Sequence, residues 1–366
     1  MRRRRLLSTA ALAVAWLTIN VVAASEPAER TPPAMVVIVQ GAAGTEEYER
    51  LFDQWASQWQ VAARAGEAEL TVVDGSTDTG QRDELLQAFA NAAVGSKRPL
   101  WIVLIGHGTF DGRTGKFNLV GPDVSARELA EWLDPIKRPI AVIHTGSSSS
   151  PFIDRMSHPG RVIVTATRSG SEVNFTRFGG YLAAAIGDVT SDLDKDGQVS
   201  LLEAFLTASR QTEAYYDSKG QLATEHALLE DTGDARGVDS GFFEGIRPVK
   251  AAAEGETLDG HVAHQWHLVP SDEERRFPDD LRSRRDELEL EIARLRDRKS
   301  EMDEESYYAS LEILLVELAQ LYEQADEAVD RNSDVGHETD AAPVDDLPPG
   351  EQDVGEVEHR KDDPSP

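Results

Sequence analysis

Five short runs of almost uninterrupted apolar residues, rich in Val and Ile, constrain the fold of this chain more than any other feature. They lie at residues 35–39, 70–73, 100–105, 140–144 and 162–166. A strand that reads as a continuous hydrophobic run is buried on both faces, which is typical of a parallel sheet covered by helices. Helical stretches separate these runs, at 46–63, at 82–93 and after the capping-box sequence at 125–128. The alternation predicts an α/β sandwich of three layers with a mostly parallel sheet.

The amino-acid composition excludes several classes of function. The chain has 66 Asp and Glu against 37 Lys and Arg, a formal net charge of -29, and no cysteine. Without cysteine there is no disulfide, iron–sulfur cluster, thiolate metal site or thiol nucleophile. Nucleic-acid binding needs clustered Lys and Arg, so we expect no nucleic-acid partner. The negative charge suits an exported protein or one that handles divalent cations.

The first residues have the layout of an export signal. Four arginines at 2–5 precede an apolar run at 6–24, which ends in the small residues Val22, Ala23 and Ala24. This pattern predicts a signal peptide at residues 1–25. The alternative is an uncleaved anchor, because about 19 apolar residues nearly span a bilayer. We expect cleavage, no membrane span afterwards, and a periplasmic, cell-envelope or secreted location.

The remaining chain divides into four segments. An α/β domain at 26–247 is followed by a loop-rich connector at 248–278. Residues 279–325 predict a helical hairpin or coiled coil that either packs on its own domain or self-associates through 281–322. Residues 326–366 hold 14 acidic and 3 basic residues, a composition that predicts disorder. The apolar residues with heptad-like spacing are Leu281, Leu288, Leu295 and Met302, then Leu311, Leu315, Leu318 and Tyr322.

A twelve-residue acidic segment at 192–203, with the sequence DLDKDGQVSLLE, fits the calcium-binding loop of an EF-hand. Carboxylates stand at positions 1, 3 and 5, Gly197 allows the sharp turn at position 6, and a glutamate closes the loop at position 12. The alternative is a solvated acidic turn. We expect Ca²⁺ to bind here. The predicted ligands are Asp192, Asp194, Asp196, Gln198 through its backbone carbonyl, Ser200 and Glu203.

Two strand ends carry a further motif. The run at 100–105 ends in Gly106-His107-Gly108, and the run at 140–144 ends in Thr145-Gly146-Ser147. This order resembles the caspase-fold cysteine peptidases, and their legumain-like branch looks nearest. The resemblance covers about residues 35–231, and the segment at 162–178 resembles the wall of the family's substrate pocket. It implies that His107 is the general base and that the nucleophilic cysteine corresponds to Gly146 or, one residue further, to Ser147.

The absence of a cysteine excludes the thiol chemistry of the family. Neither Gly146 nor Ser147 can form a thiolate, so we expect a peptidase homologue that has lost its activity. It would act as a calcium-binding module that binds or scaffolds a protein or peptide partner. One alternative is a serine hydrolase in which His107 activates Ser147. Another is a structural envelope protein organised by calcium and by the C-terminal helices.

Three histidines in the connector, His261, His264 and His267, recur at intervals of three residues. That spacing does not keep three side chains on one face of a helix or a strand. We therefore expect an ordinary connector packed against the main domain rather than a three-histidine metal site.

Overall fold

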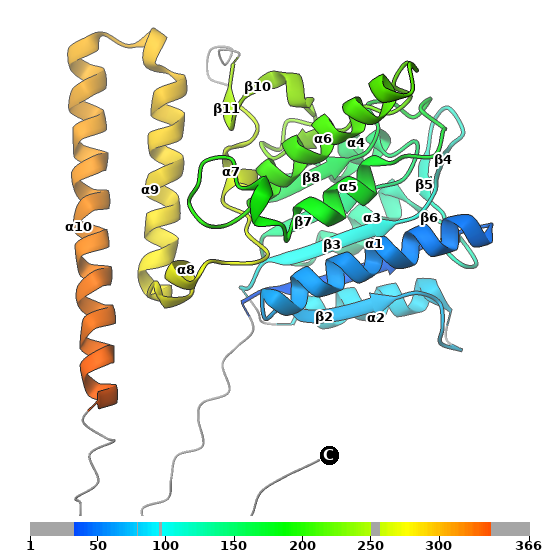
Figure 1. The fold of residues 1–366 in the computed structure, drawn as a ribbon, viewed down its shortest axis with the longest axis horizontal. Coiled ribbons are helices and arrows are strands. Elements are labelled where there is room, and N and C mark those ends of the chain that lie inside the picture. Colours follow the sequence, from blue (N-terminus) through cyan, green and yellow to red (C-terminus); the bar gives the residue numbers. More distant parts are fainter. Residues whose placement is uncertain (1–32, 79, 95–96, 250–256, 338–366) are drawn as a thin grey trace, which may run out of the picture. The chain divides into compact units, whose positions relative to one another are not determined.

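The computed structural model describes residues 33–337 except 79, 95–96 and 250–256, with side chains up to residue 329. The predicted signal peptide and the end of the acidic tail lie outside these residues. Within them, a six-stranded sheet has the order β2-β1-β3-β7-β8-β9 (Figure 1). Its strands are β1 (Met35–Gln40), β2 (Glu69–Val73), β3 (Leu100–Ile105), β7 (Ile140–His144), β8 (Arg161–Thr165) and β9 (Leu228–Glu230).

The five predicted strands are confirmed, and they pair in parallel as expected. The edge strand β9 pairs antiparallel with β8. The sequence did not predict β9, because three residues are too few for a hydrophobic pattern to appear. The same holds for the small antiparallel sheet formed by β4 (Gly108–Phe110), β5 (Gly115–Phe117) and β6 (Val124–Ser125), and for the pair β10 (Phe243–Glu244) and β11 (Arg247–Pro248).

Helices cover both faces of the sheet and produce two hydrophobic cores. Val36 and Ile38 of β1 face the core formed with α1 (Glu46–Ala65), α5 (Phe178–Ala185) and α6 (Leu201–Ser218). Val37 and Val39 face the opposite core, formed with α2 (Gln81–Ala92), α3 (Ala126–Leu133) and α4 (Ile153–Met156). Alternate strand residues point to opposite faces, which explains why the central strands β1, β3 and β7 are apolar along nearly their whole length, whereas the edge strand β2 is only partly buried. The three-layer α/β fold class is thereby confirmed.

The connector and the C-terminal segment contain four helices in the described part of the chain. These are α7 (His261–His264), α8 (Asp272–Arg276), α9 (Asp279–Asp297) and α10 (Glu304–His337). Helices α9 and α10 lie side by side as the predicted hairpin (Figure 1). Helix α10 continues past the predicted limit at residue 325, because Ala325 is buried against α9 and the acidic residues after it do not stop a helix.

The predicted apolar face of α10 is partly wrong. Leu314 and Leu321 face α9, whereas Leu315 and Tyr322 are 42% and 39% exposed. The reason is that α10 carries two adjacent apolar stripes, and spacings of three and four residues fit both. The second stripe is left on the surface of the hairpin.

The connector packs against the main domain as expected. Trp266 and Leu268 belong to the core beneath α1, α5 and α6. His261 lies apart from the other two histidines: its Nε2 is 2.6 Å from Asp297. His264 Nε2 lies 2.9 Å from Asp194, and His267 is near enough to His264 for their charges to interact. Burial lowers the pKa of His267. No helix among the described residues has the length and apolar composition needed to cross a bilayer.

A buried pair of carboxyl groups fastens the connector to the edge of the sheet. Asp231 follows β9 and accepts hydrogen bonds from the backbone N–H groups of Gly260 and Ala263 at the start of α7. Asp259 in turn accepts the N–H of Asp231 at 2.9 Å. Burial, with the neighbouring Asp231 charge, raises the pKa of Asp259 to about 8. Two carboxyl groups so close titrate as a pair, and burial raises the pKa of both, so the pair binds a proton at higher pH than isolated carboxyl groups do.

Asp259→Asn is expected to stabilise the protein at alkaline pH. The pKa of Asp259 is raised on folding, so its stabilising contribution is complete below about pH 4 and is lost as the pH rises through about 8. Asparagine keeps the acceptor for Asp231 and does not ionise. In thermal unfolding, the melting temperature of the variant relative to wild type should be higher at about pH 8.5 than at about pH 5.5. The exposed Asp217→Asn is the control, and an unchanged difference between the two pH values would contradict the interpretation.

Candidate functional site

The carboxyl ends of β3 and β7 bring the two predicted motifs together. The strands pair in parallel, with Leu104 opposite His144, so their following loops meet at one edge of the sheet. Ligands of open α/β sheets gather at this edge. Contact between the loops is direct: the Ser147 hydroxyl donates to the carbonyl of Gly108 at 3.0 Å, and the Gly108 N–H approaches the same hydroxyl at 3.4 Å.

His107 lies in an aromatic cage. Its ring meets Tyr48, Phe52 and Phe175 edge-on, with centroids 4.8, 5.2 and 6.1 Å away. Its Nε2 lies 3.2 Å from the carbonyl oxygen of Ala43, and since a carbonyl only accepts, Nε2 carries the proton. A general base needs a hydrogen bond to its nucleophile. Among the described contacts, the Ser147 hydroxyl bonds the Gly108 backbone and not His107.

Gly146 has no room for a side chain. A Cβ atom there would lie 2.4 Å from the carbonyl oxygen of Gly106 and 3.1 Å from the nitrogen of Gly108. The Gly146 N–H donates to Nδ1 of His144 at 3.1 Å. His144 is fully buried, which lowers its pKa to about 3 and keeps the ring neutral. Of the two positions proposed for the missing cysteine, only Ser147 carries a side chain. Ser147 as a whole residue is 4% exposed.

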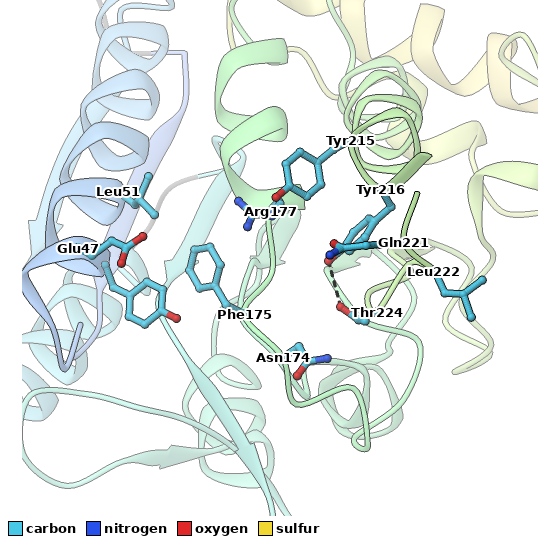
Figure 2. A pocket seen from close by; sticks show the side chains of 11 residues that line it. Glu47, Leu51, Asn174, Phe175, Arg177, Tyr215, Tyr216, Gln221, Leu222 and Thr224 are labelled. Atoms are coloured by element: carbon cyan, nitrogen blue, oxygen red, sulfur yellow. Dashed lines mark hydrogen bonds between the residues drawn. The ribbon is translucent and has the colours of Figure 1, made fainter. Parts of the chain in front are cut away.

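A cavity of about 520 Å³ lies between α1, the loop before α5 and the residues around the end of α6 (Figure 2). Two of its walls, Tyr48 and Phe175, are the same rings that contact His107. The cavity therefore adjoins the predicted active-site histidine. Its lining residues are Glu47, Tyr48, Leu51, Asn174, Phe175, Arg177, Tyr215, Tyr216, Gln221, Leu222 and Thr224.

Among the described residues, Arg177 is the only Lys or Arg that lines this cavity. Its guanidinium stacks on Tyr215 at 4.1 Å and lies 6.0 Å from the ring of Phe175. No carboxylate of the described residues forms an ion pair with it. Buried Glu225 holds this wall in place by accepting the backbone N–H of Arg177 and the hydroxyl of Tyr216, and burial raises the pKa of Glu225. An arginine stacked on an aromatic ring with free N–H donors is suited to bind a carboxylate.

The sequence did not single out Arg177 or Tyr215. The cavity residues come from α1, from the loop before α5, and from the end of α6 and the loop after it, so no local spacing connects them. The resemblance of the segment at 162–178 to a pocket wall was the only available signal. It indicated the correct loop but not the charged residue in it.

The loop at 192–203 adopts the turns that its motif requires. Lys195 and Gly197 have positive φ angles of 67° and 89°. Asp192 accepts the N–H groups of both residues, at 2.6 and 3.1 Å. Carboxylate oxygens of Asp192, Asp194 and Asp196 all lie within 4.8 Å of one another. Three of the six predicted ligands are thus gathered at one point.

The remaining ligands hold the loop closed. Glu203 is 1% exposed and accepts the N–H of Leu193 at 2.6 Å and the N–H of Ser200 at 2.8 Å. Its carboxylate thus spans the two ends of the loop, although it lies outside the group of three aspartates. Gln198 accepts the N–H of Ser271 through its side chain, which leaves its backbone carbonyl for the predicted role.

The connector supports this loop from outside. Ser200 forms an antiparallel bridge with His267, and the N–H of Leu201 donates to the carbonyl of Trp266 at 2.8 Å. His264 bonds Asp194, and this hydrogen bond lowers the pKa of the carboxyl group. Contacts of this kind orient metal ligands. The connector segment at 264–267 therefore holds the loop in place from one side.

No protein-family model and no curated protein matches the chain. Solved structures that resemble it include protein GSU0716 from Geobacter sulfurreducens, with 12% identity, 54% of this chain and 93% of that chain covered, and a TM-score of 0.37. The initiator caspase Dronc of Drosophila has 11% identity and a TM-score of 0.37, with coverage of 56% and 82%. Caspase-1 from Spodoptera frugiperda has 8% identity and a TM-score of 0.37, with coverage of 54% and 86%.

Proposed function

We propose that this chain is an exported, non-catalytic module of caspase-like fold that binds a peptide in the cavity beside His107. The observation that carries the proposal is the state of the nucleophile position. Gly146 cannot accommodate a side chain, and the hydroxyl of Ser147 is buried on the backbone of Gly108. The neighbouring cavity retains an aromatic lining and a charged residue, which are features of a ligand site.

The chemistry of the cavity favours a peptide with an acidic side chain. Arg177 offers its guanidinium from one wall, and Asn174, Gln221 and Thr224 offer polar groups that can bond a peptide backbone. The aromatic rings cover the apolar part of the ligand. Glu47 lies on the same cavity and disfavours a ligand with more than one negative charge.

Arg177→Gln is expected to weaken binding of an acidic peptide by about tenfold or more, because a charge-assisted hydrogen bond contributes about 1.5–3 kcal/mol. Fluorescence polarisation with short labelled peptides that differ only in a central Asp, Asn or Lys would measure this. Arg127→Gln, which removes a surface arginine of α3 paired with Glu131, is the control. Equal affinities for the Asp and Lys peptides, or an unaffected Arg177→Gln variant, would contradict the proposed site.

We propose that the loop at 192–203 binds calcium and has a structural role in this module. The three aspartates supply hard oxygen ligands, and Glu203 can turn from its backbone partners to complete the coordination. Occupation would relieve the repulsion among three neighbouring carboxylates. The connector that supports the loop would then be held more firmly on the α/β domain.

A further inference from the structure

The surface of α10 carries an apolar stripe that remains exposed. Tyr308 and Val316 are each 50% exposed, and Leu315 is 42% exposed. Successive residues of a helix are rotated by about 100°, so these positions fall on one side of α10, next to the seam that packs on α9. The stripe forms a shallow groove of about 430 Å³. Its lining residues are Tyr308, Leu311, Glu312, Leu315, Val316 and Ala319.

This stripe is separate from the contact that holds the hairpin together. The buried seam uses Leu314, Leu321 and Ala325 of α10. The hairpin therefore does not need the second stripe for its own packing. A contiguous apolar surface with a polar rim marks an interaction site. The spacing of Tyr308, Leu311 and Leu315, three and four residues apart, suits the side chains of another helix.

The rim of the stripe is mainly acidic, with one cation at its end, where Lys299 Nζ lies 5.5 Å from the ring of Tyr308. Glu305, Glu312 and Glu323 follow one border of the helix, and no basic residue occurs between 304 and 329. On the opposite border, Glu289 of α9 approaches the hydroxyl of Tyr322 at 3.4 Å. The sequence after residue 329 is acidic as well. Like charges would therefore meet if this chain's own tail or a second copy's α10 covered the stripe, whereas Lys and Arg side chains would be complementary.

We propose that the stripe at 308–319 binds a cationic amphipathic helix of a partner protein. Apolar side chains of the partner would fill the groove, and its Lys or Arg residues would face the acidic rim. This surface lies on α10, whereas the cavity beside His107 is lined by α1, the loop before α5 and the residues around the end of α6. The proposal is therefore independent of the proposed peptide site.

Binding of a designed helical peptide tests the proposal. The probe has Leu at heptad spacing and Lys at the flanking positions, and its counterpart has Glu in place of Lys. Fluorescence polarisation with the full chain at physiological salt should detect binding of the lysine peptide only. Leu315→Glu should weaken that binding by about tenfold or more, because the peptide loses its apolar contact with Leu315. The added negative charge would by itself attract the lysine peptide, so a loss of affinity cannot be due to charge. Val61→Glu, which adds the same charge on the exposed surface of α1, should leave the affinity unchanged.

Three results would overturn the proposal. The first is absence of binding by the lysine peptide. The second is an equal change of affinity in Leu315→Glu and Val61→Glu, which would indicate unspecific attraction of the peptide to an acidic protein. The third comes from sedimentation velocity: a wild-type oligomer that Leu315→Glu dissociates would identify the stripe as an interface between copies of this chain. Circular dichroism of each variant confirms that its helices are retained.

Discussion

Glu203→Gln is expected to abolish the response of the protein to calcium. In wild type, calcium at a hundred times its dissociation constant should raise the unfolding free energy by about 2.7 kcal/mol. The substitution removes the carboxylate that closes the loop. Changes in outer contacts alone lower metal affinity by about 10–100-fold, so the loss of a ligand should exceed about 100-fold. Calorimetric titration and thermal unfolding with calcium or chelator measure both effects.

The Glu203→Gln experiment must separate lost calcium binding from a general loss of folding stability. Both can occur, because Glu203 also accepts the backbone N–H groups of Leu193 and Ser200. The useful quantity is therefore the difference between calcium and chelator within each variant. Asp188→Asn is the matched control, since Asp188 caps the short helix at 189–191 and is not a predicted ligand. A wild-type protein without any calcium response, or a full response in Glu203→Gln, would contradict the calcium site.

Gly146→Ala should destabilise the protein substantially. The new Cβ would lie 2.4 Å from the carbonyl oxygen of Gly106. That strand end cannot retreat freely, because Gly106 itself is packed on Phe117 and Gly41. Overpacking of a tight core costs about 1–3 kcal/mol, which corresponds to a melting temperature lower by about 2–12 °C for a domain of this size.

For the same steric reason, we expect that a thiol cannot be restored at Gly146. Gly146→Cys should be at least as destabilised as Gly146→Ala, whereas Ser147→Cys should fold. Gly187→Ala is the control, because a Cβ there would meet the side chain of Ala62 at 3.3 Å rather than a backbone atom. A Gly146→Ala variant as stable as Gly187→Ala would show that the site has room for a nucleophile.

The strands and the turns of the acidic loop at 192–203 could be predicted from the sequence because both are local patterns. A continuous apolar run or the spacing of Asp192, Asp194 and Asp196 is visible within a dozen residues. Strand β9 and the cavity could not, since β9 is only three residues long and Arg177 meets Tyr215 only through the packing of separate elements. On α10, Leu314 and Leu315 are equally apolar, and only the contact with α9 determines which of them is buried.

Hydrolysis is the most direct test of the central claim that the site is catalytically silent. Fluorogenic peptide and ester substrates would be incubated with the folded protein and its His107→Ala variant, each with calcium and with chelator. We expect no turnover in wild type above that of His107→Ala, in either condition. Turnover with or without calcium that is lost equally in His107→Ala and Ser147→Ala would contradict a catalytically silent site. It would identify a serine hydrolase.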